Sequence, residues 1–400
     1  MDGSSRILSQ TGILFLVLLL VTPIADFLTV YARYYDITSM ERFSLLYRML
    51  TIGVGFLLFL YNSDVKRVVL WGSYFIAQLI ILLSSVFSNA ESEHVGETLL
   101  LLFKFFTFFI YIDALSVLLS RQVISFNVFI KIFNILISLY LIAIIYGFIF
   151  DYALFKNYDG ERWGVKGIII AGNEASSLLI VALCWGVVMR EKYASNIILL
   201  LSVLAIIGSG TKAAILGLLL ISIGLSLIKY GIKGLLYSAF GLSIFLIILS
   251  VVYNFSSGVQ EEVLKTFSYF EYQFDNAAGG SIISLLLSGR DYKLAVVTDD
   301  VYEFYPWAFI FGGYPITSYF VEMDFFDLWY MMGVGSICYM YYFIKTWSFD
   351  ITSNSAVIDK FKVVVFGVYV CLAFTGGHFM YSAVTAPILA ALILHMNANE

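Results

Sequence analysis

The chain has 400 residues, of which 61% are hydrophobic and 13% carry a charge, and its net charge is -5. Soluble domains are about half apolar and about a quarter charged, so this composition excludes an ordinary soluble protein. A nucleic-acid partner requires a basic surface, which a chain with this charge does not suggest. We therefore expect an integral membrane protein.

Long apolar runs follow one another along the chain. A helix needs about 20 apolar residues to cross the ~30 Å hydrocarbon core. The runs predict an all-α, polytopic bundle of about twelve spans in a single membrane domain, residues 1–400. The first run is too long for the apolar core of a signal peptide and is interpreted as a span. In chain order the predicted spans are residues 11–32, 43–62, 68–88, 98–119, 126–150, 167–189, 194–209, 211–229, 234–255, 323–344, 361–379 and 383–396.

Lys and Arg distinguish the two sides of this bundle. With the N-terminus inside, every short cytoplasmic loop is basic, whereas the loop at 89–96 on the other side has neither residue. Both termini are therefore predicted in the cytoplasm. Residues 256–322 then form a large external loop between spans nine and ten. Within it, 261–274 has the spacing of an amphipathic helix, and 281–287 is a second short apolar segment.

Cysteine and histidine show no metal-binding pattern. The three cysteines fall inside apolar runs without zinc or disulfide spacing, and the three histidines are far apart in sequence. We predict neither a metal nor a cofactor.

Several cations remain in the predicted external loops, against the positive-inside tendency. Guanidinium groups are the usual bidentate partners of phosphate, so these cations suggest a site for a lipid-linked diphosphate. The main candidates are Arg162 and Arg290, with Lys212 at the outer end of a helical hairpin. The alternative is that they are ordinary loop charges paired with neighbouring acids.

Four stretches of the chain carry a family pattern. The first is Arg162-Trp-Gly followed by Gly172-Asn173-Glu174, and the second is Gly208-Ser209-Gly210-Thr211-Lys212. The third is Ser288-Gly289-Arg290 followed by Gly312-Gly313, and the fourth is Val321-Glu322-Met323-Asp324. Together, over about residues 160–335, they resemble the O-antigen polymerase and O-antigen ligase superfamily of bacterial polysaccharide assembly. Lys212 stands where that family usually has arginine.

The resemblance implies an inverting, metal-independent glycosyltransferase at the outer face of the bacterial cytoplasmic (inner) membrane. It would polymerise oligosaccharide repeat units carried on undecaprenyl diphosphate into O-antigen or a related surface polysaccharide. Arg162, Arg290 and Lys212 would bind the diphosphate. A polysaccharide chain-length regulator is a further candidate partner.

The acceptor side departs from the ligase pattern. Ligases of this family commonly carry a histidine near the outer end of the span after the large loop, where this chain has Glu322-Met-Asp324. The departure favours the polymerase, in which Glu322 or Asp324 would orient or deprotonate the acceptor hydroxyl. The alternative is that both acids face water at a helix start. His378, in the last external turn, is a further candidate or an ordinary turn histidine.

Two other functions stay open at this stage. One is the ligase, which transfers glycan to a lipid A-core acceptor. The other is a flippase for the same lipid-linked units, although a transporter more often shows two similar halves, which this sequence lacks. The intramembrane charges Asp26, Lys104 and Asp113 have no assigned role.

Overall fold

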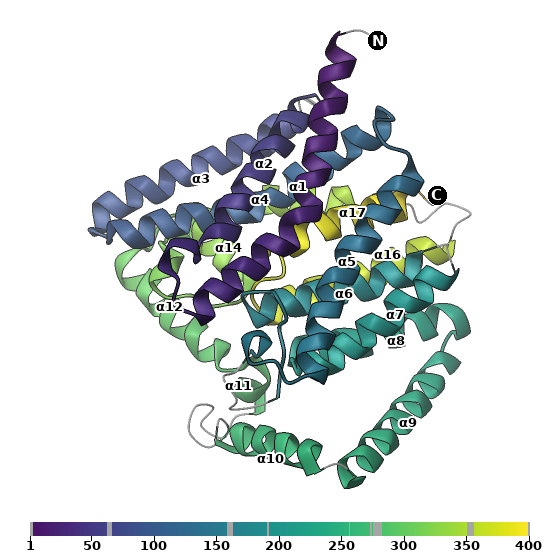
Figure 1. Ribbon diagram of the computed structural model, residues 1–400. Helices are drawn as coiled ribbons and strands as arrows, with labels where there is room; N and C mark the ends of the chain where they lie inside the picture. The colour runs from purple at the N-terminus through teal and green to yellow at the C-terminus, as the bar shows by residue number, and fades with distance from the viewer. Residues whose placement is uncertain are drawn as a thin grey trace. The chain divides into compact units, whose positions relative to one another are not determined.

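The computed structural model describes residues 3–61, 66–157, 163–189, 192–255, 257–272, 274, 282–349 and 356–398. Across these ranges the regular elements are helices, and the only extended pairing is a single bridge between Lys156 and Val165 (Figure 1). The prediction of an all-α fold is confirmed for this part of the chain.

The helices follow the predicted apolar runs closely. The first nine are α1 (Gly3–Tyr34), α2 (Phe43–Leu60), α3 (Lys66–Ser88), α4 (Ser92–Ser120), α5 (Phe126–Ile149), α6 (Gly172–Val188), α7 (Lys192–Ser209), α8 (Lys212–Tyr230) and α9 (Lys233–Phe255). The region predicted as an external loop contains α10 (Ser257–Tyr272), α11 (Ile282–Leu287), α12 (Arg290–Phe304), α13 (Ala308–Phe311) and the 3-10 helix η4 (Ile316–Ser318). The last four are α14 (Asp324–Met332), α15 (Gly335–Thr346), α16 (Ala356–Thr375) and α17 (Thr385–Asn397).

Six helices in the described part of the chain are long and apolar enough to cross a membrane. They are α1, α2, α3, α4, α5 and α8, and the apolar helices α6, α7 and α17 are shorter. Length and composition are thus those of a helical membrane protein. The total of twelve spans and the external position of residues 256–322 stay predictions.

The predicted span 323–344 is not one helix. It divides into α14 and α15 at Gly333, whose φ of +53° lies in the left-handed region. A Cβ at this position would lie 2.1 Å from the carbonyl oxygen of Ile310, so only glycine fits the turn. The Val334 amide donates to that same oxygen at 2.8 Å. Hydropathy does not predict this break, because the residues on both sides of Gly333 are apolar.

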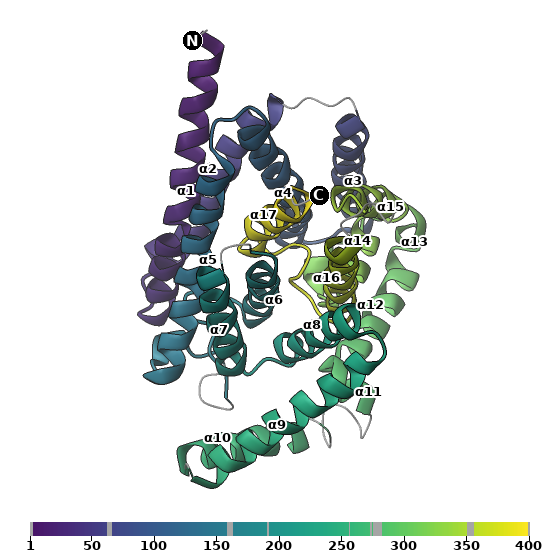
Figure 2. The same ribbon diagram turned by 90° about the vertical axis from the view of Figure 1, so that its right-hand side faces the viewer.

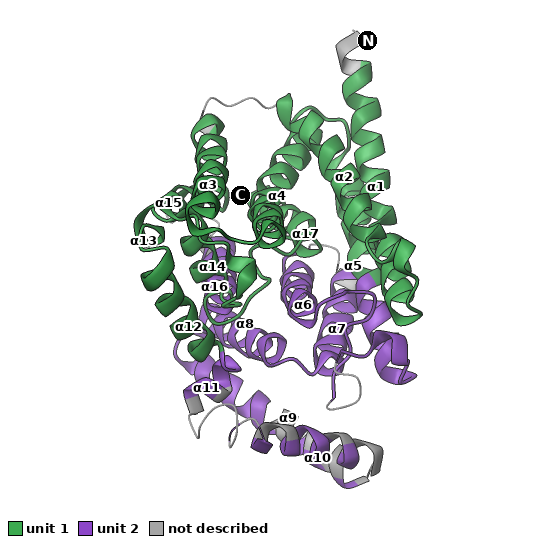
Figure 3. Cartoon of the chain, turned by 90° about the vertical axis from the view of Figure 1, so that its left-hand side faces the viewer, with its two compact units in different colours: residues 1–139, 290–348, 373–398 green, residues 140–289, 349–372, 399–400 purple. Residues whose placement is uncertain are grey.

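The chain folds into two compact units. Unit 1 comprises residues 1–139, 290–348 and 373–398, and unit 2 comprises residues 140–289, 349–372 and 399–400 (Figure 3). The two units share α5 and α16, each of which contributes residues to both. We describe each unit by itself.

Helix α4 forms the core of unit 1. It packs against α2, α3 and α17, and α3 also packs against α15 (Figure 2). A helix that is apolar all round is expected in an interior, and Phe105, Phe106, Phe108 and Phe109 on α4 are fully buried. The ring of Tyr339 on α15 contacts three of these phenylalanines.

Two acidic residues within predicted spans of unit 1 form ion pairs with arginines. Asp26 on α1 pairs with Arg48 on α2 at 2.6 Å, and Ser44 also donates to this carboxylate. Asp113 on α4 pairs with Arg67 on α3 at 2.8 Å. Charges inside a membrane protein are costly unless they pair, so these contacts account for Asp26 and Asp113. They also give Arg48, one of the cations near the first predicted external loop, a structural role.

In unit 2, α6 packs against α7 and α8, and α8 packs against α9. The buried run Leu178–Trp185 of α6 forms the centre of this unit. Helices α7 and α8 are joined through Gly210 and Thr211 and contact each other, as expected for the predicted helical hairpin.

The predicted topology can be tested by cysteine labelling. In a background in which Cys184, Cys338 and Cys371 are alanine, a membrane-impermeant maleimide should label Gly258→Cys on α10 in intact spheroplasts. Lys345→Cys, in a predicted cytoplasmic loop, is the control and should react only after lysis. The opposite pattern would reverse the orientation and place α10 in the cytoplasm.

Candidate functional site

The segment that leads into α14 has an unusual backbone. Glu322 adopts a φ of +61°, which is uncommon for a residue with a side chain and indicates that its surroundings hold it. Gly377 in the turn between α16 and α17 packs directly on it. A Cβ on Gly377 would lie 3.0 Å from the Glu322 carbonyl oxygen. The last turn of the chain and the start of α14 are therefore closely apposed.

Two cations of α12 meet the Glu322 carboxylate. Lys293 Nζ lies 2.6 Å from Oε1, and Arg290 Nη2 lies 3.4 Å from Oε2. Arg290 and Lys293 are three residues apart on one helix, so they project from the same face. The Arg290 side chain is 13% exposed, whereas those of Lys293 and Glu322 are about one third exposed, at 32% and 33%. The cluster is thus partly buried and open to solvent on one side.

These cations control the ionisation of Glu322. Burial alone raises its pKa, but the hydrogen bond from Lys293 and the charges of Lys293, Arg290 and His378 outweigh burial. The net result is a pKa of Glu322 below its ordinary value. The carboxylate stays ionised at neutral pH, and the pairing is lost only when the pH falls through that lowered pKa.

His378 belongs to the same cluster. Its backbone is also left-handed, with a φ of +72°, and its ring centroid lies 4.7 Å from that of Tyr381. Its charge, when protonated, acts on Glu322. The structure therefore brings together three of the predicted site residues, Arg290, Glu322 and His378, although 88 residues separate the first from the last in sequence.

Asp324 has a different environment. It is fully buried, and its two carboxylate oxygens accept three backbone hydrogen bonds from the last turn. The donors are the amides of His378, Phe379 and Met380, at 2.8, 2.8 and 2.6 Å. A carboxylate bound in this way is not accessible to a sugar hydroxyl. The geometry favours a positioning role for Asp324, which holds His378 near Glu322.

Replacing Asp324 with asparagine should loosen this turn. An amide NH2 would face backbone donors, so we expect a loss of about 2 kcal/mol or more in stability. Hydrogen exchange of the amides of residues 378–380 should accelerate. Asp327→Asn is the matched control. Asp327 is equally buried, but its Oδ2 has no hydrogen-bond partner in the described part of the chain, so an amide there costs less. Equal effects in the two variants would contradict the role assigned to Asp324.

The other predicted cations belong to unit 2. Lys212, at the start of α8, donates to the Ser288 hydroxyl at 3.3 Å. Arg162 lies outside the described residues. Its neighbour Trp163 is placed, and the indole Nε1 donates to the Gly208 carbonyl oxygen at 3.2 Å. The first two family-like stretches therefore contact each other within unit 2.

Lys293 is the site residue that sequence reasoning missed. It is one of several cations in the predicted external loops, and no motif distinguishes it. The available signal was its position one helical turn after Arg290 in a segment with helical spacing, which places both cations on one face. Its partner could not be read from the sequence, because Glu322 lies 29 residues away.

No protein-family model matches this chain, and no curated protein matches it. The case for a function therefore rests on the motifs in the sequence and on the geometry of this cluster.

Proposed function

We propose that the protein is a membrane glycosyltransferase that polymerises undecaprenyl-diphosphate-linked oligosaccharide repeat units into O-antigen or a related surface polysaccharide. The observation that supports this most is the cluster of Arg290, Lys293, Glu322 and His378 in unit 1. Transfer from a lipid diphosphate needs cations for the leaving group and a group that accepts a proton. The cluster contains both, and the four family-like stretches point to the same chemistry.

Arg290 and Lys293 are the proposed partners of the donor diphosphate. A guanidinium binds phosphate oxygens through two parallel hydrogen bonds, and an ammonium adds a point charge. Both cations lie on one face of α12 and converge on one carboxylate, so the same spacing suits two oxygens of a diphosphate. A contribution from Arg162 and Lys212 to this binding stays a prediction from the family resemblance.

Glu322 is the proposed proton acceptor. The acceptor hydroxyl oxygen forms a bond to the anomeric carbon while the bond from that carbon to the diphosphate oxygen breaks. The hydroxyl proton moves to the carboxylate, and the electron pair leaves with undecaprenyl diphosphate. Attack from the face opposite the leaving group inverts the configuration at that carbon. The step as written uses no metal.

The ion pairs of the free protein suggest how donor and base are linked. Without donor, Glu322 neutralises Arg290 and Lys293, which lowers its pKa and makes it a weak base. A bound diphosphate would compete for both cations and release the carboxylate. The pKa of Glu322 would then rise towards its ordinary value, so the base would strengthen only when the donor is in place.

The ligase is the second candidate, for one specific reason. Family ligases commonly carry a histidine near the outer end of the span after the large loop, and the sequence lacks one there. The fold brings His378 to residues 322–324 from the last turn of the chain. An imidazole at this place keeps transfer to a lipid A-core acceptor open as a function.

A reconstituted assay tests both candidates. The purified protein, in vesicles, receives one synthetic undecaprenyl-diphosphate oligosaccharide with and without EDTA. A polymerase should form chains of several repeats from this substrate alone, at the same rate in EDTA. A ligase should form product only when a lipid A-core acceptor is added. Absence of product both with and without the added acceptor would contradict the proposed glycosyltransferase activity. Loss of activity in EDTA would contradict a metal-independent mechanism.

The proposal also sets the location and partners. The enzyme would reside in the bacterial cytoplasmic (inner) membrane with the cluster at its outer face, where undecaprenyl-diphosphate-linked units are assembled into polymer. A polysaccharide chain-length regulator is the candidate protein partner.

A further inference from the structure

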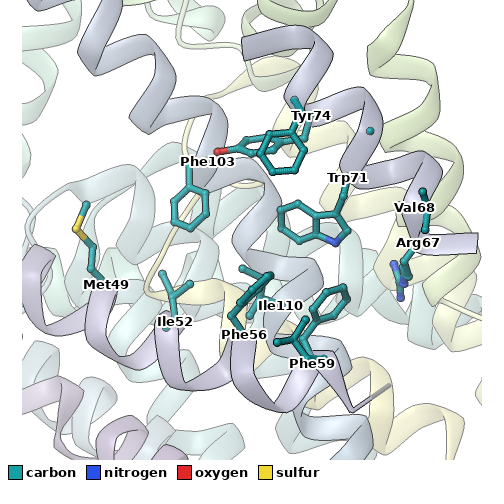
Figure 4. A pocket seen from close by; sticks show the side chains of 14 residues that line it. Met49, Ile52, Phe56, Phe59, Arg67, Val68, Trp71, Tyr74, Phe103 and Ile110 are labelled. Atoms are coloured by element: carbon teal, nitrogen blue, oxygen red, sulfur yellow. The ribbon is translucent and has the colours of Figure 1, made fainter. Parts of the chain in front are cut away.

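Unit 1 contains an apolar cavity of about 860 Å³ that the proposed transfer does not use. Side chains of α2, α3 and α4 line it, and rings of Phe56, Phe59, Trp71, Tyr74 and Phe103 make up much of its wall (Figure 4). The site of Arg290 and Glu322 shares no lining residue with it. The cavity therefore calls for a separate explanation.

The cavity reaches the surface of the protein. Met49, Phe56, Leu60, Val68 and Phe75 line it and are also between 40% and 66% exposed. Helices α2, α3 and α4 are all among those able to cross a membrane. In a bilayer, an apolar opening between such helices faces lipid, so a lipid chain is the molecule that can enter it.

Polar groups occur at one end of the cavity. Arg67 on α3 lines it and is held by Asp113 at 2.8 Å and by the rings of Phe109 and Tyr342. Its Nη1 is buried and has no hydrogen-bond partner in the described part of the chain, and the same holds for Trp71 Nε1. Arg67 and Trp71 are four residues apart on one helix face, and Figure 4 shows both at this end.

Two buried donors without acceptors are costly, and a phosphate would satisfy both. An unpaired buried donor costs about 1–3 kcal/mol. Phosphate and ester oxygens accept from guanidinium and indole N–H groups. The wall away from these donors is apolar. The cavity thus has the arrangement of an amphiphile: a place for phosphate at one end and for a hydrocarbon chain along the rest.

The stretch of α2 that lines the cavity is about as long as one leaflet is thick. From Met49 to Leu60, α2 rises about 16 Å, which is roughly half of the ~30 Å hydrocarbon core. Leu60 and Arg67 flank the short α2–α3 connection, so the polar end lies towards a membrane surface and the Met49 end towards the middle. We propose that a glycerophospholipid of the leaflet on the Arg67 side binds here, with its phosphate at Arg67 and Trp71 and one acyl chain in the cavity.

Fluorescence of Trp71 tests this directly. The full chain in detergent is titrated with phosphatidylglycerol that carries brominated acyl chains, which quench tryptophan on contact. Subtracting the signal of Trp71→Phe isolates Trp71 from the other tryptophans. We expect saturable quenching. Brominated diacylglycerol, which lacks the phosphate, should quench at least about tenfold less effectively.

Two variants test the two ends of the cavity. A Cβ at Gly53 meets nothing within 4 Å, so Gly53→Leu should fill the cavity without a clash and weaken binding about tenfold or more. Gly367→Leu, at another open position that does not line the cavity, on α16, is its control and should bind normally. Arg67→Gln combined with Asp113→Asn removes the phosphate partner without leaving a buried charge, and should weaken binding similarly.

Three results would overturn the inference. The first is unchanged quenching in Gly53→Leu, and the second is quenching by brominated diacylglycerol equal to that by brominated phosphatidylglycerol. The third is displacement of the brominated lipid by a polyprenyl phosphate at lower concentrations than by unlabelled phosphatidylglycerol. The last would assign the cavity to an isoprenoid chain. None of these results depends on glycosyl transfer, so the test is independent of the proposed function.

Discussion

Replacing Arg290 with alanine should lower the rate of polymer formation by about 100-fold to 1,000-fold, the usual cost of removing one group that stabilises the charge of a transition state. Arg290 is largely buried beside Glu322, and its guanidinium is the only bidentate donor of the described cluster. Lys293 keeps its own contact with Glu322 at 2.6 Å in this variant, so the fold should tolerate the change. The measurement is polymer formed per minute by equal amounts of purified protein.

Arg290→Lys and Lys265→Ala are the informative comparisons. Arg290→Lys keeps the charge but loses the fork of two donors, so it should recover little of the rate. Lys265 is a cation of α10 that pairs with Glu261 at 3.0 Å, and its removal should leave the rate nearly unchanged. Wild-type chain lengths in Arg290→Ala, or an equal loss in Lys265→Ala, would remove Arg290 from the proposed site.

Replacing Glu322 with glutamine should lower the turnover rate by about 100-fold or more if the carboxylate accepts the proton. Glutamine keeps the size of the side chain and can still accept from Lys293, so the ion pair is weakened while most of the contact remains. If Glu322 only neutralises the two cations, turnover at saturating donor should stay close to normal, because the diphosphate then occupies them. Glu261→Gln on α10 is the control for loss of a paired carboxylate.

The pH profiles of the wild-type protein distinguish these roles further. The acidic limb of kcat/KM reports the free enzyme, and that of kcat reports the donor complex. Glu322 has a lowered pKa in the free protein, and the bound diphosphate should raise it. The acidic limb of kcat should therefore lie at higher pH than that of kcat/KM, and both limbs should disappear in Glu322→Gln. Limbs that persist in this variant would point to another base, with His378 the next candidate.

The sequence predicts helices well here because the signal is local. The run 98–119 is almost wholly apolar, and 78% of the apolar window of α4 is correspondingly buried. The break at Gly333 was not predictable from hydropathy, since its cause is the close approach of Ile310. At Gly333 a tertiary contact ends a helix that the local apolar pattern would continue.

In the candidate site, too, the sequence predicts features that depend on local pattern and misses those that depend on tertiary contacts. Arg290, Glu322 and His378 could be proposed from short motifs, whereas the pairing of Glu322 with Lys293 depends on how α12 meets the start of α14. Asp324 illustrates the limit most clearly. In the sequence it resembles a catalytic acid at a helix start, whereas the structure shows it bound by the amides of residues 378–380, more than fifty positions later.

The bond between Asp324 and the last turn also orders events during synthesis of the protein. The carboxylate emerges from the ribosome before its three partners, and 54 residues separate it from the first of them. Until α16 and the following turn are made, the Asp324 carboxylate at the start of α14 lacks the donors that allow it to be buried. We therefore expect the start of α14 to remain near water until translation is almost finished, because burying the carboxyl group before then would require it to be protonated. Nascent chains that stop short of His378 would carry Arg290, Lys293 and Glu322 but would lack the turn that binds Asp324 and supplies His378.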